Sequence, residues 1–191
     1  MPAQDRNLQV YPLTPDRWDD LTALFGDNGA QGGCWCMWWR LSPTEYKQSA
    51  GEANRDAFQR CAQIGPPPGL LAYLDQQVVG WCSLAPRETL RRIPRSATWK
   101  PVDQQSVWSL SCFYIAPAYR GQGVATRLLH SAIEHARAQG VLLLEAYPKD
   151  SPELHEADRN MYFGTLAMFQ AVGFIEVARR HPHFPIMRLQ L

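Results

Sequence analysis

A loop at residues 120–125 carries the clearest chemical signal in this sequence. It reads Arg-Gly-Gln-Gly-Val-Ala and precedes a helical pattern of apolar residues spaced four apart between positions 124 and 136. The first amides of a helix lack partners in the chain, and the helix dipole makes that end positive. Gly121 and Gly123 let the backbone approach a phosphate closely. The loop therefore predicts an anion-binding site, with a ligand-free glycine turn as the alternative.

The same loop departs from two well-known phosphate-binding motifs. No Gly-Lys-Ser/Thr follows it, as a P-loop requires, and it lacks the third glycine of a dinucleotide fingerprint. A nucleotide-binding module would also need residues that read a base and a ribose, and we find no such set. What remains is an Arg-x-x-Gly-x-Ala loop between a strand and a helix.

The hydrophobic pattern predicts the elements that position this loop. A buried strand is expected over 107–115, and a helix begins at 124 and ends at Gly140. A second buried strand is expected over 141–147. Strand, helix and strand in this order predict a right-handed parallel crossover.

Residues 113–125, Phe-Tyr-Ile-Ala-Pro-Ala-Tyr-Arg-Gly-Gln-Gly-Val-Ala, resemble the acetyl-CoA motif of the GNAT family of N-acyltransferases. The resemblance is strong over 107–146 and moderate over 162–178. It implies an α/β (α+β) fold, in which helices flank a mixed, mostly antiparallel twisted sheet with a splayed pair of parallel strands. It also implies direct transfer of an acetyl group from acetyl-CoA to a primary amine of an unidentified small-molecule or peptide acceptor. The alternative is an acyl-CoA-binding module without transferase activity.

The resemblance further implies which residues hold acetyl-CoA. The backbone of Phe113 and Ile115 would bind the pantetheine arm in the gap between the splayed strands, and the loop amides would bind the pyrophosphate. The full set is Phe113, Tyr114, Ile115, Arg120, Gly121, Gln122, Gly123, Val124 and Ala125. Phe169 would pack against the cofactor, where many members of the family carry a tyrosine that can donate a proton and a phenyl ring cannot.

Tyr162 is the candidate proton donor for the leaving thiolate, because Phe169 cannot take that role. It lies one or two helical turns before Phe169 in the expected last helix. Tyr114 and Tyr147 are weaker candidates. A half-buried packing residue is the alternative interpretation of Tyr162.

A free alkylamine is mostly protonated at neutral pH, so transfer needs a group that accepts its proton. The candidate bases are Glu88, at the end of the third strand, and Glu145, on the strand after the central helix. His181 and His183 are further candidates. Each of these residues also has a structural interpretation, which the sequence leaves open.

Residues 34–40, Cys-Trp-Cys-Met-Trp-Trp-Arg, form the densest aromatic cluster of the chain. In one interpretation Trp35 and Trp38 form a wall of the acceptor pocket, and Arg40 holds an anionic group or packs on an indole ring. In the other, the segment is a structural plug that covers the edge of the core.

The five cysteines are spread among apolar neighbours, which indicates reduced and mostly buried thiols. Cys34 and Cys36 form a pair, but a structural zinc site needs four ligands and no suitably spaced second pair follows. No metal is therefore expected. Cys112 lies on the central strand and is interpreted as a core thiol rather than a nucleophile, because the sequence shows no base beside it.

Caps and breakers predict the remaining elements. They are a strand over 8–13, a helix over 15–25, a helix from 43 to 64 that weakens at Gly51, a hairpin of 70–74 and 78–84, an Arg-rich loop over 85–105 with room for one helical turn, a helix over 161–174, and an antiparallel pair of 174–178 and 187–191. The Arg-rich loop is either a solvated loop or a basic rim for the CoA phosphates.

Length and composition fit a single soluble domain spanning residues 1–191, with 46% hydrophobic residues. The net charge of +1 gives no electrostatic reason to expect nucleic acid or an anionic membrane as a partner. No apolar run approaches the roughly 20 residues that span a bilayer, and the polar N-terminus has no signal-peptide core. We therefore expect a cytoplasmic protein, either monomer or homodimer.

Overall fold

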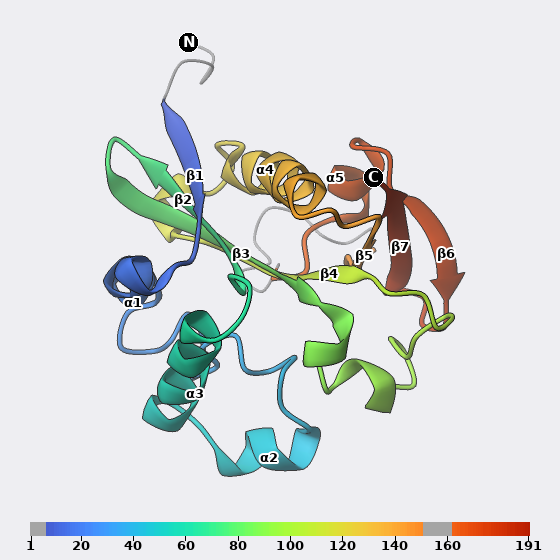
Figure 1. The fold of residues 1–191 in the computed structure, drawn as a ribbon, viewed down its shortest axis with the longest axis horizontal. Helices are drawn as coiled ribbons and strands as arrows, with labels where there is room; N and C mark the ends of the chain where they lie inside the picture. The colour runs from blue at the N-terminus through green and yellow to red at the C-terminus, as the bar shows by residue number, and fades with distance from the viewer. Residues whose placement is uncertain (1–6, 151–161) are drawn as a thin grey trace.

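A computed structural model describes residues 7–150 and 162–191. Its centre is a seven-stranded sheet in the order β1-β2-β3-β4-β5-β7-β6 (Figure 1). The strands are β1 (Leu8–Pro12), β2 (Gly69–Leu74), β3 (Gln77–Pro86), β4 (Trp108–Ile115), β5 (Leu143–Ala146), β6 (Ile175–Arg179) and β7 (Pro185–Gln190). Only β4 and β5 pair in parallel, and all other neighbours are antiparallel. The predicted mixed, mostly antiparallel sheet is confirmed.

Helices cover both faces of the sheet (Figure 1). They are α1 (Trp18–Phe25), α2 (Pro43–Gln48), α3 (Glu52–Gln63), α4 (Val124–Ala138) and α5 (Leu166–Gln170). α4 buries its apolar stripe against the sheet on one face, where Leu128 and Leu129 join a core that includes Phe113. α1 and α3 build a second core on the other face, around Trp81. Burial of each such side chain stabilises the fold by roughly 1.5–3 kcal/mol.

Several predicted elements differ from the structure in extent or form. The helix expected over 43–64 is two helices, because the chain leaves helical geometry at Ser49 and Gly51 takes a φ of 56°. The helix over 15–25 begins as a 3₁₀ turn and becomes α-helical only at Trp18. The Arg-rich loop over 85–105 contains two 3₁₀ turns, Arg87–Thr89 and Ile93–Arg95, rather than one.

The helix expected over 161–174 is shorter in the structure. Thr165 caps α5 by accepting a hydrogen bond from the Met168 amide at 3.2 Å, so the helix begins only at Leu166. Met161 lies outside the described residues.

The parallel strands β4 and β5 pair over three residues only, from Trp108 opposite Leu144 to Leu110 opposite Ala146. β4 then continues to Ile115 with β3 alone as its partner, because β5 ends at Ala146. One edge of β4 is therefore open from Ser111 onward. This is the splayed pair that the family resemblance implies.

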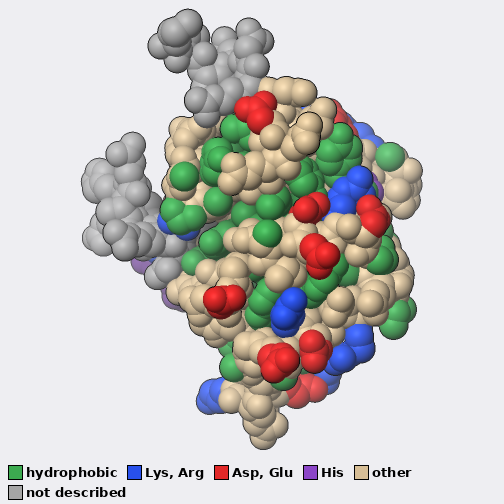
Figure 2. Space-filling view, turned by 90° about the vertical axis from the view of Figure 1, so that its left-hand side faces the viewer, with side chains coloured by type: hydrophobic (Ala, Val, Ile, Leu, Met, Phe, Trp, Pro, Cys, Tyr) green, Lys and Arg blue, Asp and Glu red, His purple; other side chains and the backbone are tan. Residues whose placement is uncertain are grey.

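On the face shown in Figure 2, acidic and basic side chains are interspersed rather than gathered into a field of one sign. Hydrophobic side chains reach the surface between them. Across the described part of the chain, no helix is both long enough and apolar enough to span a bilayer.

Candidate active site

A cleft of about 420 Å³ opens where β4 has lost its parallel partner. We call it the β4–α4 cleft. Its walls are the end of β4, the loop before α4, the first residues of α4 and the segment leading into α5. The lining residues are Phe113, Tyr114, Ile115, Tyr119, Arg120, Gly121, Gly123, Val124, Ala125, Thr126, Tyr162, Gly164, Thr165 and Met168.

The loop at the base of α4 has the geometry of an anion site. Gly121 and Gly123 have φ of 71° and 80°, which residues with a side chain rarely adopt, and a Cβ at either position would meet nothing within 4 Å. Gly123 is the N-cap of α4, and no side chain among the described residues caps the first amides of this helix. The amides and the positive end of the dipole are thus left for a ligand such as a pyrophosphate.

The open edge of β4 is partly occupied. Ala116 N–H donates to Val79 on β3, so by strand alternation Phe113 and Ile115 direct their backbone groups to the opposite edge. There, Phe113 N–H donates to the Tyr162 carbonyl at 2.6 Å, and the Ile115 carbonyl accepts from Arg120 Nε at 3.0 Å. A pantetheine arm would have to replace the Tyr162 carbonyl to bind the Phe113 amide.

Two residues that the resemblance implied as cofactor contacts are not among the described residues that line the cleft. Phe169 is fully buried in the core, with its ring 6.1 Å from that of Phe113 and 5.1 Å from that of Phe174. It packs against Phe113, which lines the cleft, but does not line the cleft itself. Gln122 is exposed, and its side-chain amide donates to the Ala118 carbonyl at 2.8 Å.

A second cavity, of about 410 Å³, lies on the other side of Tyr114 and Tyr162. We call it the aromatic cavity. Its lining is Phe25, Ala30, Gln31, Gly32, Cys34, Cys36, Trp38, Trp39, Tyr46, Cys112, Tyr114, Tyr162 and Phe163. Tyr114 and Tyr162 stack in parallel with ring centroids 6.4 Å apart, and they belong to both cavities. The two cavities therefore meet at this pair.

The aromatic cluster at residues 34–40 is divided between pocket and core. Trp38 lines the aromatic cavity, as one interpretation predicted, and so does Trp39. Trp35 does not, because it packs into the core at 6.2 Å from Trp18 and 5.7 Å from Phe25. The segment therefore contributes both to a cavity wall and to the core, through different tryptophans.

Arg40 lies buried behind the cavity wall. Its Nη1 donates to Thr89 Oγ1 at 3.4 Å, whereas Nε and Nη2 have no hydrogen-bond partner among the described residues. The guanidinium lies 5.6 Å from the Phe58 ring centroid. Its burial lowers the pKa of Arg40 from its ordinary value.

Three thiols line the aromatic cavity, those of Cys34, Cys36 and Cys112, and only the pKa of Cys36 is lowered among them. Trp81 Nε1 donates to Cys36 Sγ at 3.0 Å. Hydrogen bonds from Cys112 and Trp81 lower the pKa of Cys36, although burial opposes them. Burial and the neighbouring Cys36 raise the pKa of Cys34 to about 11. Within residues 7–150 and 162–191, no group of three His, Cys, Asp or Glu side chains is placed to hold a metal ion.

Tyr162 is half-buried at the junction of the cavities, next to the open end of β4. Burial raises the pKa of its phenol above the ordinary value, so the hydroxyl stays protonated at neutral pH. The position and the protonation state both suit a proton donor.

The candidate bases do not line either cavity. Glu88 is exposed on the 3₁₀ turn after β3. His181 and His183 lie in the turn between β6 and β7, where the His183 ring contacts the Asp150 carbonyl at 3.0 Å. No carboxylate or imidazole is among the described residues that line the two cavities.

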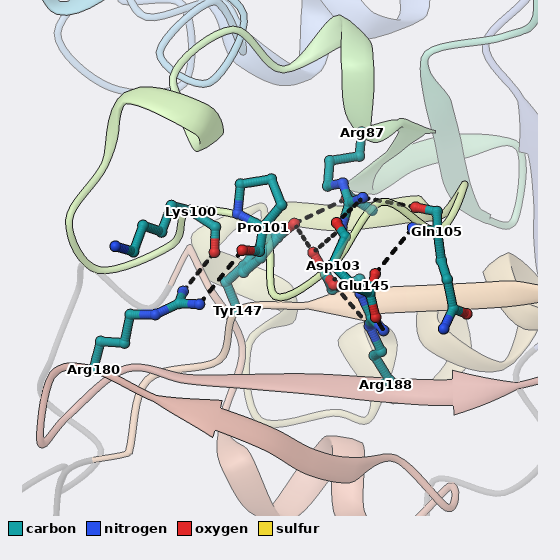
Figure 3. A network of polar contacts seen from close by, with 10 residues as sticks. Arg87, Lys100, Pro101, Asp103, Gln105, Glu145, Tyr147, Arg180 and Arg188 are labelled. Atoms are coloured by element: carbon teal, nitrogen blue, oxygen red, sulfur yellow. Dashed lines mark hydrogen bonds and ion pairs between the residues drawn. The ribbon is translucent and has the colours of Figure 1, made fainter.

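Glu145 belongs to a buried polar network instead (Figure 3). Its side chain is fully buried and accepts hydrogen bonds from Tyr147 Oη at 2.6 Å, Arg188 Nε at 2.9 Å and Arg87 Nη1 at 3.3 Å. Arg188 also forms two hydrogen bonds with Asp103. The structure thus places Glu145 in ion pairs and hydrogen bonds within the sheet, away from the lining of both cavities.

The family model of the Acetyltransferase (GNAT) family matches residues 35–174. A comparison with curated proteins finds no match. Among solved structures, a GNAT-family acetyltransferase from Listeria monocytogenes is similar with a TM-score of 0.61 and 11% identity, over 98% of both chains. A ribosomal-protein-alanine N-acetyltransferase from Brucella melitensis is similar with a TM-score of 0.54 and 20% identity, over 96% of this chain and 99% of that one. The GNAT domain of S. lividans PAT is similar with a TM-score of 0.57 and 14% identity, over 96% of this chain and 90% of that one.

Proposed function

The chain belongs to the GNAT family of acetyltransferases, and on this premise we propose that it transfers the acetyl group of acetyl-CoA directly to a primary amine. The observation that carries the proposal is the meeting of the β4–α4 cleft and the aromatic cavity at Tyr114 and Tyr162. Two substrates bound on either side of this pair would have their reacting atoms adjacent. Holding two reactants together in this way is a large part of catalysis of a bimolecular step.

The β4–α4 cleft fits acetyl-CoA at its polar end. The amides of residues 124–126, with Gly121 and Gly123, would hold the pyrophosphate, because the loop leaves open space and no side chain competes. The open edge of β4 would take the pantetheine arm. When bound, acetyl-CoA supplies the activated acetyl thioester.

In this proposal Tyr162 Oη holds the proton that the departing sulfur takes. The phenol lies at the junction of the cavities, and burial raises its pKa, which keeps the proton available. The proton of the acceptor ammonium would pass to water or to a base outside the described lining. Glu88 and Glu145 are no longer our candidates, because neither lines a cavity.

A second candidate function is an acyl-CoA-binding module without turnover. It is favoured by the lack of a carboxylate or imidazole among the described lining residues. Release of CoA thiol from acetyl-CoA, measured with and without a primary amine, separates the two functions. Amine-dependent thiol release supports the transferase, and binding of acetyl-CoA without any such release supports the module.

A further inference from the structure

The composition of the aromatic cavity bears on the acceptor. Resting on the proposed function, we propose that the acceptor amine is carried by an apolar, ring-bearing group without a second positive charge. Seven of the residues that line this cavity have aromatic side chains, in a space of about 410 Å³. That volume is in the range of cavities that bury small, mostly apolar ligands.

The rings form a preorganised wall because they pack on one another. Trp38 meets Trp39 edge-on at 4.7 Å and Phe163 at 6.2 Å, and Trp39 stacks on the buried Tyr147 at 5.4 Å. A flat ring that enters this wall gains apolar burial and edge-to-face contacts. A hydrophilic acceptor would exchange its water contacts for few polar partners, because the polar side chains of the lining are one amide, three phenols and three thiols.

The charges behind the wall are positive. The Arg92 guanidinium lies 4.2 Å from the Trp38 ring centroid and 5.6 Å from that of Tyr46, so one face of each ring already meets a cation. Arg40 is buried, two of its nitrogens have no partner in residues 7–150 and 162–191, and it lies close enough to Cys36 to act on it electrostatically. These two cations would repel a second ammonium group on the acceptor. The nearby carboxylate of Glu45 is already engaged by the Ser42 amide and Arg91.

The reacting nitrogen and the ring of the acceptor have separate places. The nitrogen belongs at Tyr114 and Tyr162, where the cavities meet. The ring then extends toward Trp38, Trp39 and Tyr46 on the far side of the cavity.

The test compares two amines of similar length, 2-phenylethylamine and 1,5-diaminopentane, by amine-dependent thiol release from acetyl-CoA at one pH. We expect kcat/KM to be about 10- to 100-fold higher for 2-phenylethylamine, because this factor corresponds to the free energy of burying one aromatic ring.

Tyr46→Ala should raise KM for 2-phenylethylamine several-fold and leave KM for acetyl-CoA unchanged. Tyr46 is suited to this test because α2 has no buried residue, so the fold should tolerate the change. Tyr11→Ala, an exposed tyrosine on β1, is the matched control.

A second variant tests the charge argument in the opposite direction. Gln31→Glu places a carboxylate in the cavity lining, where it would attract the second ammonium of 1,5-diaminopentane. The ratio of kcat/KM for 2-phenylethylamine to kcat/KM for 1,5-diaminopentane should therefore fall by about fivefold or more. Gln63→Glu, at the exposed end of α3, is the control and should leave this ratio unchanged. Equal or better use of 1,5-diaminopentane by the wild type would overturn the acceptor class while leaving the transferase intact. Acetyl-CoA binding with no turnover of either amine would overturn both proposals.

Discussion

At the scale of single residues, the junction between the cavities depends on Tyr162. The sequence predicted this tyrosine as the donor only because Phe169 cannot donate a proton. The structure adds a physical reason, since Tyr162 lines both cavities whereas Phe169 is fully buried. The distinction depends on where β4 loses its partner, which residue types alone do not reveal.

Tyr162→Phe should lower kcat by about 10- to 100-fold and leave the Kd of acetyl-CoA unchanged, because only a proton donor is removed. Burial raises the pKa of the Tyr162 phenol above 10, so the protonated form persists beyond that pH. The wild-type kcat should therefore show no falling limb below about pH 10. An unchanged kcat in Tyr162→Phe would contradict the assignment of Tyr162 as the proton donor.

The thiols of the aromatic cavity should differ in reactivity in an order that exposure alone does not predict. Cys34 is more exposed than Cys36, yet hydrogen bonds from Cys112 and Trp81 lower the pKa of Cys36 and burial raises that of Cys34 to about 11. Because the thiolate is the nucleophile, iodoacetamide at pH 7.5 should alkylate Cys36 before Cys34. Peptide mass spectrometry over time measures the order. Cys82 is the unreactive internal control, because burial raises its pKa to about 12. If Cys34 were labelled before Cys36, the predicted order of thiol reactivity would be wrong.

At the scale of elements, the Glu145 network joins segments far apart in the sequence. Arg87 follows β3, Asp103 lies in the connection to β4, and Arg188 comes from β7 (Figure 3). The long connection between β3 and β4 is thus fixed to the sheet by charge. Sequence reasoning placed Glu145 on the correct strand but could not assign its partners, because ion pairs between distant segments have no local signal.

Glu145→Gln should destabilise the fold by about 3 kcal/mol or more, since it leaves Arg87 without its counter-ion and the buried Arg188 with Asp103 alone. Glu176→Gln is a matched control, because its pair with Arg179 on the surface should contribute about 1 kcal/mol or less. Urea denaturation followed by circular dichroism measures both. If Glu145→Gln instead retained full stability and lost activity, Glu145 would be a catalytic base and the network an incidental contact.

The accuracy of the sequence prediction also varied between elements. The sheet, the central crossover and α4 followed from hydrophobic periodicity and from glycines at loop and cap positions. The loop before α2 did not, because Trp35 and Cys36 adopt φ of 44° and 55°, held in part by the bond from Trp35 N–H to the Gly29 carbonyl. Such local conformations cost free energy that only the surrounding packing repays. Tyr46, Phe163 and Gln31 were missed as cavity residues, because the sequence does not show which distant segments the fold brings together around the cavity.

At the scale of the whole molecule, the two cavities draw on different parts of the chain. The β4–α4 cleft is built from residues 113–126 and 162–168, where the family resemblance is strong or moderate. The aromatic cavity takes most of its wall from residues 25–46, where the resemblance is diffuse. The lining of the cleft that we propose for acetyl-CoA could therefore be predicted from a local motif, whereas the lining of the aromatic cavity required the fold.

Calorimetric titration with acetyl-CoA tests the central claim, that the loop before α4 is the phosphate site, most directly. Gly123→Asp places a carboxylate at the N-cap of α4, where it would occupy the first amides and repel a phosphate. Gly140→Asp is the matched control at the other end of the helix, since both glycines have positive φ and open space at Cβ. We predict wild-type binding that Gly140→Asp preserves and Gly123→Asp weakens by about 100-fold. Equal Kd values for the two variants, or no binding by folded wild type, would contradict the account.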